Sequence, residues 1–188
     1  MPLPHAILGF LDFRPMSGYD LKKYFDQSIA HFWSATKSHI YQALEKLEQD
    51  GFVVSHIIPQ EGKPNRREYQ ITETGRAELH RWLTSPLPPG QLREGWLIQV
   101  FFSHQSTNEE IAALLEARMQ AIRERLAFYR TVVQEVVAQN AERVGIERAR
   151  QLWQITLDHG IDYYEFEIVW LEKLLERINE LPPLRLPH

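Results

Sequence analysis

TKSHIYQALEKLEQDGFVVSHIIPQEGKPNRREYQIT, residues 36–72, is the stretch of sequence that decides the fold. Its first part predicts a helix over 36–50, because Ile40, Leu44 and Leu47 recur at helical spacing and form one apolar stripe. That stripe can dock on the rest of a domain, and the polar residues on the remaining arc are then left to face solvent or a partner.

A hairpin follows that helix. Gly51 is a natural C-terminal stop for the helix, and residues 53–58 are β-branched and strand-like. Residues 59–65 form a turn region, and residues 68–72 alternate as a return strand. The stretch therefore predicts one helix followed by a two-stranded wing.

Three further helices flank this stretch. The first covers about residues 4–12, and the second begins after Ser17, which has the spacing of an N-terminal cap with Asp20. Thr72 can cap a helix after the hairpin, whose inward-facing residues are expected to be Leu79, Trp82 and Leu83. Three helices, a hairpin and a helix are the order of a winged helix-turn-helix. The predicted fold is therefore mainly α with a small two-stranded wing, joined to a C-terminal helical arm.

A cluster of prolines marks the boundary between the two parts. Residues 86–90 read PLPPG, which cannot continue a helix. We predict a winged helix-turn-helix DNA-binding domain over 1–85, a linker over 86–91, a helical dimerisation domain over 92–181 and a flexible tail over 182–188.

Two long helices of the second part carry apolar seams. The first seam alternates spacings of four and three over Leu115, Met119, Ile122, Leu126, Tyr129, Val133 and Val136. The second repeats that spacing from Leu157 to Ile178. Such seams drive helices to pair, and with little else to cover them they predict burial between two chains, hence a homodimer. The candidate dimerisation residues are Leu115, Ile122, Leu126, Leu157, Ile161, Tyr164, Ile168, Leu171 and Leu175.

The composition excludes several function classes. Hydrophobic residues make up 44% of the 188 and charged residues 24%, which is ordinary for a soluble globular protein. The chain has no cysteine, no secretory signal and no apolar run of membrane length, so we expect a cytoplasmic protein with no membrane partner. Nucleotide-binding, hydrolase and metalloprotease motifs are absent, and the histidines do not cluster at ligand spacing. We therefore expect no catalytic site, no cofactor and no metal.

The distribution of charge points to the first half for nucleic-acid binding. The formal net charge is -4, but residues 1–85 hold ten basic and ten acidic residues, so the acidic excess lies after them. A helix roughly 10–12 Å across fits the major groove of DNA, and a basic hairpin tip suits phosphate or minor-groove contact. The candidate residues for double-stranded DNA are Lys37, Ser38, His39, Tyr41 and Gln42 on the helix, and Lys63, Asn65, Arg66 and Arg67 on the wing. A winged-helix adaptor that binds a protein partner and no DNA stays open as the alternative.

At these residues the chain resembles the PadR-type transcriptional regulators, in the longer subgroup of that family. The matching stretches of the first half are SGYDL at 17–21, FWS at 32–34, DGFV at 50–53 and GKP at 62–64. In the second half, LRE at 92–94, FF at 101–102 and WLE at 170–172 match the family's helical C-terminal part. No single piece is specific, but the combination in this order is, and it covers nearly the whole chain.

The resemblance implies a two-fold dimer that binds pseudo-palindromic promoter DNA and usually represses. Carried onto the matching positions, it implies DNA contacts from Ser38, His39 and Tyr41 on the helix, and from Lys63 and Arg66 on the wing. Some family members release DNA when a small aromatic molecule binds, which implies an aromatic-lined pocket between the winged domain and the arm. Its candidates are Tyr19, Trp33, Trp96 and Phe101, with the alternative that these rings are core.

Overall fold

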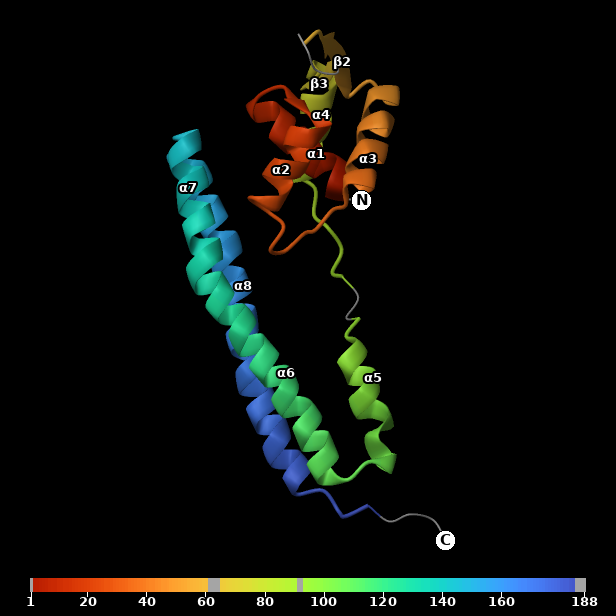
Figure 1. Ribbon diagram of the computed structural model, residues 1–188, viewed down its shortest axis with the longest axis vertical. Helices are drawn as coiled ribbons and strands as arrows, with labels where there is room; N and C mark the ends of the chain where they lie inside the picture. The colour runs from red at the N-terminus through yellow and green to blue at the C-terminus, as the bar shows by residue number, and fades with distance from the viewer. Residues whose placement is uncertain (1, 61–64, 91–92, 185–188) are drawn as a thin grey trace. The chain divides into compact units, whose positions relative to one another are not determined.

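The structure is a computed structural model that describes residues 2–60, 65–90 and 93–184. It divides into two compact units between Pro88 and Pro89 (Figure 1). We call the first unit the winged domain and the second the arm. Within the described residues, no helix has both the length and the hydrophobicity that crossing a membrane would require.

The winged domain has the predicted order of elements. They are α1 (Pro2–Phe13), β1 (Met16–Ser17), α2 (Gly18–Asp26), α3 (Lys37–Gln49), β2 (Val53–Ile58), β3 (Arg66–Ile71) and α4 (Glu73–Leu83). The caps expected at Ser17 and Thr72 are both confirmed. The Ser17 hydroxyl accepts a hydrogen bond from the backbone N–H of Asp20, and the Thr72 hydroxyl accepts one from the backbone N–H of Gly75.

The sheet has three strands, one more than the predicted wing. Its order is β1-β3-β2, and both pairings are antiparallel. The added strand β1 pairs Met16 with Tyr69, and the hairpin pairs Val53 with Ile71. A strand of two residues is too short to show the alternation by which strands are recognised in a sequence. Its pairing ties the start of α2 to the base of the wing.

The core of the winged domain forms where α1, α2 and α3 pack together. The predicted stripe of Ile40, Leu44 and Leu47 is buried, and its neighbours in the core include Leu8 and Phe25. One expectation for α4 is wrong: Leu79 is buried, but Leu83 is 65% exposed. Trp82 is partly buried and its ring stacks on His5 of α1, whereas Leu83 is the last residue of α4 and lies outside the buried core.

The arm is helical throughout its described secondary structure. Its elements are α5 (Gly95–Phe102), the 3-10 turn η1 (Ser103–Gln105), α6 (Asn108–Phe128), the π-helical turn η2 (Tyr129–Val133), α7 (Gln134–Val144) and α8 (Glu147–Asn179). α6, η2 and α7 follow one another along a single rod, and α8 returns antiparallel beside it (Figure 1). Gly145 makes the turn between them with a left-handed φ of 67°, a conformation that glycine adopts without steric cost.

The two apolar seams pack against each other inside one chain. Leu115 and Ile122 of α6 share a buried cluster with Leu171 and Ile178 of α8, and Leu157 packs in a second cluster with Tyr129. The remaining seam candidates Leu126, Ile161, Tyr164, Ile168 and Leu175 are also buried or partly buried in this arrangement. The antiparallel hairpin therefore covers both seams within one chain.

The first seam also shifts register at η2. Tyr129 and Val133 are buried as predicted, but the next buried residue is Val137 rather than Val136. A π-helical turn bonds residue i to i+5 and so takes up one extra residue. The apolar face downstream of it therefore moves one position along the chain.

Candidate nucleic-acid interface

Helix α3 presents a polar face opposite its buried stripe. Thr36 caps its N-terminus, where its hydroxyl accepts a hydrogen bond from the backbone N–H of His39 at 3.2 Å. This cap leaves the polar residues of the first two turns free to face outward. All five helix residues predicted to bind DNA are exposed: Lys37, Ser38, His39, Tyr41 and Gln42.

Tyr41 is the one large ring on this face, and a glycine of α2 determines its place. A Cβ atom at Gly18 would lie only 2.7 Å from Cζ of Tyr41, so the ring rests against bare backbone. The ammonium of Lys37 lies 5.9 Å from the ring centroid, within the range of a cation–π contact. The ring is therefore held from two sides, yet Tyr41 remains exposed to a partner.

The two wing arginines are both paired with carboxylates. Arg66 donates to Asp20 at 2.8 Å and to Glu68 at 3.1 Å. Arg67 donates to Glu48 of α3 at 2.6 Å. Their charges are thus partly neutralised in the absence of DNA. Of the other wing candidates, Asn65 is exposed and Lys63 lies outside the described residues.

The carboxylates that hold these arginines are themselves held ionised. Burial raises the pKa of Asp20, but hydrogen bonds from the Ser17 hydroxyl and backbone N–H, with the nearby Arg66, outweigh burial and leave the pKa below its ordinary value. The hydroxyl of Ser55 donates to Glu48 at 2.5 Å and is the main reason that the pKa of Glu48 is lowered, with Arg67 contributing. Both carboxylates therefore stay ionised to a lower pH than an ordinary carboxyl group does.

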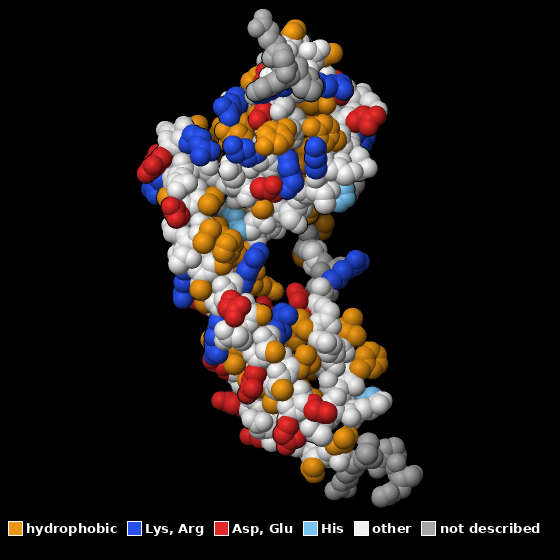
Figure 2. Space-filling view, in the orientation of Figure 1, with side chains coloured by type: hydrophobic (Ala, Val, Ile, Leu, Met, Phe, Trp, Pro, Cys, Tyr) orange, Lys and Arg blue, Asp and Glu red, His pale blue; other side chains and the backbone are white. Residues whose placement is uncertain are grey.

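A hollow of about 470 Å³ joins the helix to the wing. Its lining brings Ser38, Tyr41 and Gln42 of α3 together with Arg67 of β3. The other lining residues are Glu45, Glu48, Gln49 and Tyr69. Glu48 was not among the predicted site residues, and its position seven residues after Tyr41, two helical turns on the same side, is the signal that could have found it. Figure 2 shows basic side chains beside apolar ones on the visible face of the winged domain.

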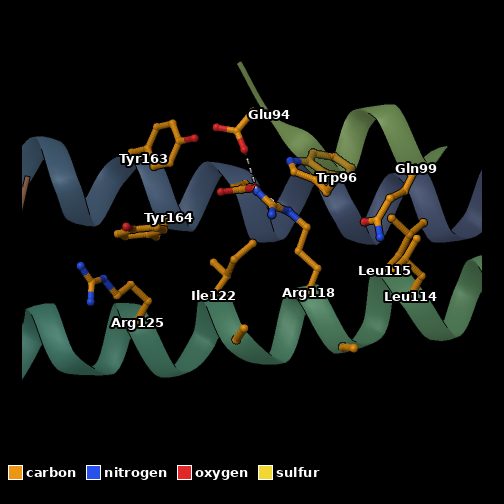
Figure 3. Close-up of a pocket in the computed structure, with 13 residues that line it drawn as sticks. Glu94, Trp96, Gln99, Leu114, Leu115, Arg118, Ile122, Arg125, Tyr163 and Tyr164 are labelled. Atoms are coloured by element: carbon orange, nitrogen blue, oxygen red, sulfur yellow. Dashed lines mark hydrogen bonds and ion pairs between the residues drawn. The ribbon is translucent and has the colours of Figure 1, made fainter. Parts of the chain in front are cut away.

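The four aromatic residues predicted to line an effector pocket occupy different environments. Tyr19 of α2 is 68% exposed, and Trp33, in the segment before α3, is also exposed. In the arm, Phe101 is 78% exposed and lies 5.0 Å from Phe102, ring centroid to ring centroid. Trp96 instead lines a groove of the arm, together with residues of α6 and α8 (Figure 3). Phe101 does not line that groove.

Comparison with known proteins shows which class of protein this chain belongs to. Residues 7–81 match the model of the transcriptional regulator PadR-like family, and residues 92–179 match the model called virulence activator alpha C-term. A probable transcriptional regulator of Mycobacterium tuberculosis is 34% identical over 96% of this chain and 99% of its own length.

Two solved structures extend the match over the whole fold. Bacillus subtilis PadR in complex with operator DNA superimposes with a TM-score of 0.77 at 26% identity, covering 95% of this chain and 99% of that one. The Vibrio cholerae virulence activator AphA gives a TM-score of 0.72 at 27% identity, with 96% and 99% covered. The same B. subtilis protein, named a negative transcriptional regulator, has also been solved with p-coumaric acid.

A winged helix with a polar recognition face and a long helical arm defines the class of winged-helix DNA-binding transcriptional regulators. Transcriptional regulators of this class are not enzymes. The similarity over nearly the full length of the chain also identifies its family within the class. The chain belongs to the PadR-like family of transcriptional regulators.

Proposed function

We propose that this regulator is a repressor that binds a pseudo-palindromic promoter site as a homodimer and leaves it when a small aromatic molecule binds. The support is the full-length similarity to B. subtilis PadR, a negative regulator solved on its operator DNA and with p-coumaric acid. Binding to promoter DNA would place the protein in the cytoplasm.

The exposed polar face of α3 is the observation that carries this proposal. Ser38, His39 and Tyr41 would meet base edges in the major groove, with Lys37 and Gln42 beside them. The wing residues would meet phosphates, which position a protein on DNA without reading its sequence. These are Lys63, Asn65, Arg66 and Arg67. In a two-fold dimer the two α3 helices would lie roughly 34 Å apart, one turn of DNA.

The homodimer would form through apolar residues that the hairpin of the arm leaves uncovered. α8 has a second apolar stripe on the side away from its seam, and all of its members are exposed. They are Leu152, Ile155, Phe166, Val169 and Trp170. Short helix α5 adds Ile98, Phe101 and Phe102, also exposed. An apolar surface of this kind is typical of a protein–protein interface.

Fluorescence anisotropy tests operator binding. A duplex from upstream of this protein's own gene, and any duplex selected from a genomic DNA library, are each compared with a scrambled duplex at two salt concentrations. We expect preference for the native sequence and an affinity that falls with salt, with a slope of about -0.9 per phosphate contact. Failure to enrich any sequence from the library would contradict the proposal. A panel of phenolic acids that includes p-coumaric acid, titrated into the complex, tests the effector response, and retention of DNA with all of them would contradict that part.

A further inference from the structure

A row of polar residues runs along the exposed side of α3, next to the ring of Tyr41. Its members follow one another at spacings of four, three and four residues, which places them on one face of the helix. All of them are exposed, and all of them line the hollow that joins α3 to the wing. This polar stripe consists of Ser38, Gln42, Glu45 and Gln49.

The polar stripe differs from the residues around it because its side chains have no partner within the described part of the chain. Lys37 lies against the ring of Tyr41, and Glu48 accepts from Ser55 and pairs with Arg67. The side chains of the polar stripe make no hydrogen bond or ion pair with any described residue. Their donors and acceptors are therefore available to a partner that enters the hollow.

The unpaired carboxylate of Glu45 restricts which bases can lie opposite it. A carboxylate only accepts hydrogen bonds, and phosphates repel it. In the major groove, guanine presents only acceptors, thymine presents an acceptor and a methyl group, and adenine presents an acceptor beside its amino group. Cytosine alone presents an amino donor with no acceptor on the same edge. Glu45 therefore favours cytosine and disfavours the other three bases.

Gln42, one helical turn before Glu45, has the chemistry that suits a different base. Its amide has an oxygen that accepts and an amino group that donates, which match the amino group and the ring nitrogen N7 of adenine. From Gln42 to Glu45 the helix rises about 4.5 Å, close to the step of about 3.4 Å between base pairs. The two side chains can therefore meet neighbouring base pairs.

We propose that Glu45 and Gln42 determine the base preference of this regulator by selecting a cytosine and an adenine on neighbouring base pairs of each half-site. The carboxylate of Glu45 accepts from the amino group of cytosine. The amide of Gln42 accepts from the amino group of adenine and donates to its N7. This assignment rests on the proposed function, because α3 must lie in the major groove for either contact to form.

Selection from a randomised duplex library with the full chain, followed by anisotropy on modified duplexes, tests the assignment. The enriched half-site should contain the neighbouring cytosine and adenine. N4-methylcytosine still pairs with guanine but replaces the amino hydrogen in the major groove by a methyl group. It should weaken binding of the native chain about tenfold, in the range of one base contact, and should have little effect on Glu45→Ala.

The adenine is tested in the same way. Replacing it by 7-deazaadenine, which lacks N7, should weaken the native chain about tenfold and leave Gln42→Ala nearly unaffected. Both substituted positions are exposed, so neither variant disturbs the core of the winged domain.

A change of specificity and a charge control complete the test. Glu45→Gln turns the acceptor into an amide, so a second selection should enrich adenine in place of cytosine at that base pair. Asp50→Asn removes a carboxylate from the end of the same helix, where it pairs with Lys46 outside the hollow, and should leave the selected sequence unchanged.

Several results would overturn the assignment. They are an enriched half-site without the neighbouring cytosine and adenine, a modified base that affects the native chain and the corresponding alanine variant equally, and selection of the same sequence by Glu45→Gln. In each of these cases the chain still binds a preferred duplex, so the operator proposal stands. A library that yields no preferred duplex would overturn both.

Discussion

Helices α3 and α8 both bury one apolar side, but their exposed sides differ in polarity. Each buries an apolar stripe, Ile40 to Leu47 in α3 and Leu157 to Ile178 in α8. The opposite side of α3 is polar, with Tyr41 as its one large ring. The opposite side of α8 carries large apolar residues such as Ile155 and Phe166, which remain exposed.

The residues on the buried side of a helix therefore indicate how the chain folds, and the residues on its exposed side indicate what kind of partner it can bind. A polar outer side with ring and amide groups suits the edges of bases, whereas an apolar one suits another protein surface. The seam residues hold the hairpin of the arm together, and the exposed apolar residues on the other side of α8 are available for a second chain.

The sharpest test of this contrast places the same charge on the two sides of α8. Leu171→Glu buries a carboxylate at a fully enclosed position and should cost about 3–5 kcal/mol of unfolding free energy. Phe166→Glu, at a position 67% exposed, should change stability by less than about 1 kcal/mol but shift the protein from dimer to monomer.

Urea denaturation and sedimentation measure the two effects separately. If Leu171→Glu unfolded no more easily than Phe166→Glu, the intrachain role of the seam would be wrong. A Phe166→Glu variant that still sedimented as a dimer would instead exclude this stripe as the interface.

Substitutions at two glycines test how tightly the winged domain is packed. A Cβ at Gly75 in the first turn of α4 would lie 2.1 Å from the carbonyl oxygen of Phe52, whereas one at Gly9 in α1 would meet nothing within 4 Å. We expect Gly75→Ala to destabilise the domain by about 2–3 kcal/mol, because backbone must move. Gly9→Ala should stabilise it by up to about 1 kcal/mol through helix propensity. Thermal unfolding measures both, and equal effects would contradict this packing.

Local features of the fold were predictable from the sequence because they depend on neighbours in the chain. The cap at Ser17 follows from its spacing of three residues to Asp20, and the caps expected at Ser17 and Thr72 are both present. The stripe of α3 and the wing hairpin follow from periodicity in the same way. Strand β1 and the turn η2 were missed, since the first is too short and the second leaves no mark on composition.

The electrostatic part of the candidate sites was not predictable, since it joins residues distant in sequence. Arg66 meets Asp20 across 46 positions, and Arg118 meets Glu167 across 49. A single sequence contains no signal for such pairs, because each side chain alone reads as a solvated charge. The exposure of the α3 residues was predictable, and the neutralisation of the wing arginines was not.

A smaller effect should distinguish residues that contact bases from residues that contact phosphates. Tyr41→Ala should weaken binding to the cognate duplex about tenfold and to a scrambled duplex much less, if Tyr41 meets a base edge. Arg67→Ala should weaken both duplexes alike and reduce the salt slope by about 1, as expected for a phosphate contact. Anisotropy on the two duplexes checks both variants. An equal loss for Tyr41→Ala on both would assign the ring to packing on Gly18.

The smallest expected effect concerns Glu48 of α3, which pairs with Arg67 of the wing. Since its carboxylate neutralises Arg67 in the free protein, Glu48→Gln should release that positive charge and raise affinity for all DNA by about two- to fivefold, in the range of an exposed ion pair. The serine neighbour provides a matched control. Ser55→Ala removes the hydroxyl that donates to Glu48 but leaves both charges, and should change DNA affinity little.

The pH dependence of stability gives an independent measurement on the same residue. The pKa of Glu48 is lower when folded than when unfolded, so its contribution is complete above the ordinary carboxyl pKa of about 4.3 and is lost as pH falls through the folded pKa. The native protein should therefore be more stable than Glu48→Gln at pH 7, and urea denaturation should show the difference shrinking below about pH 4. A difference that stayed constant down to pH 3 would mean that Glu48 acts through shape rather than charge, and the gain in DNA affinity should then be absent as well.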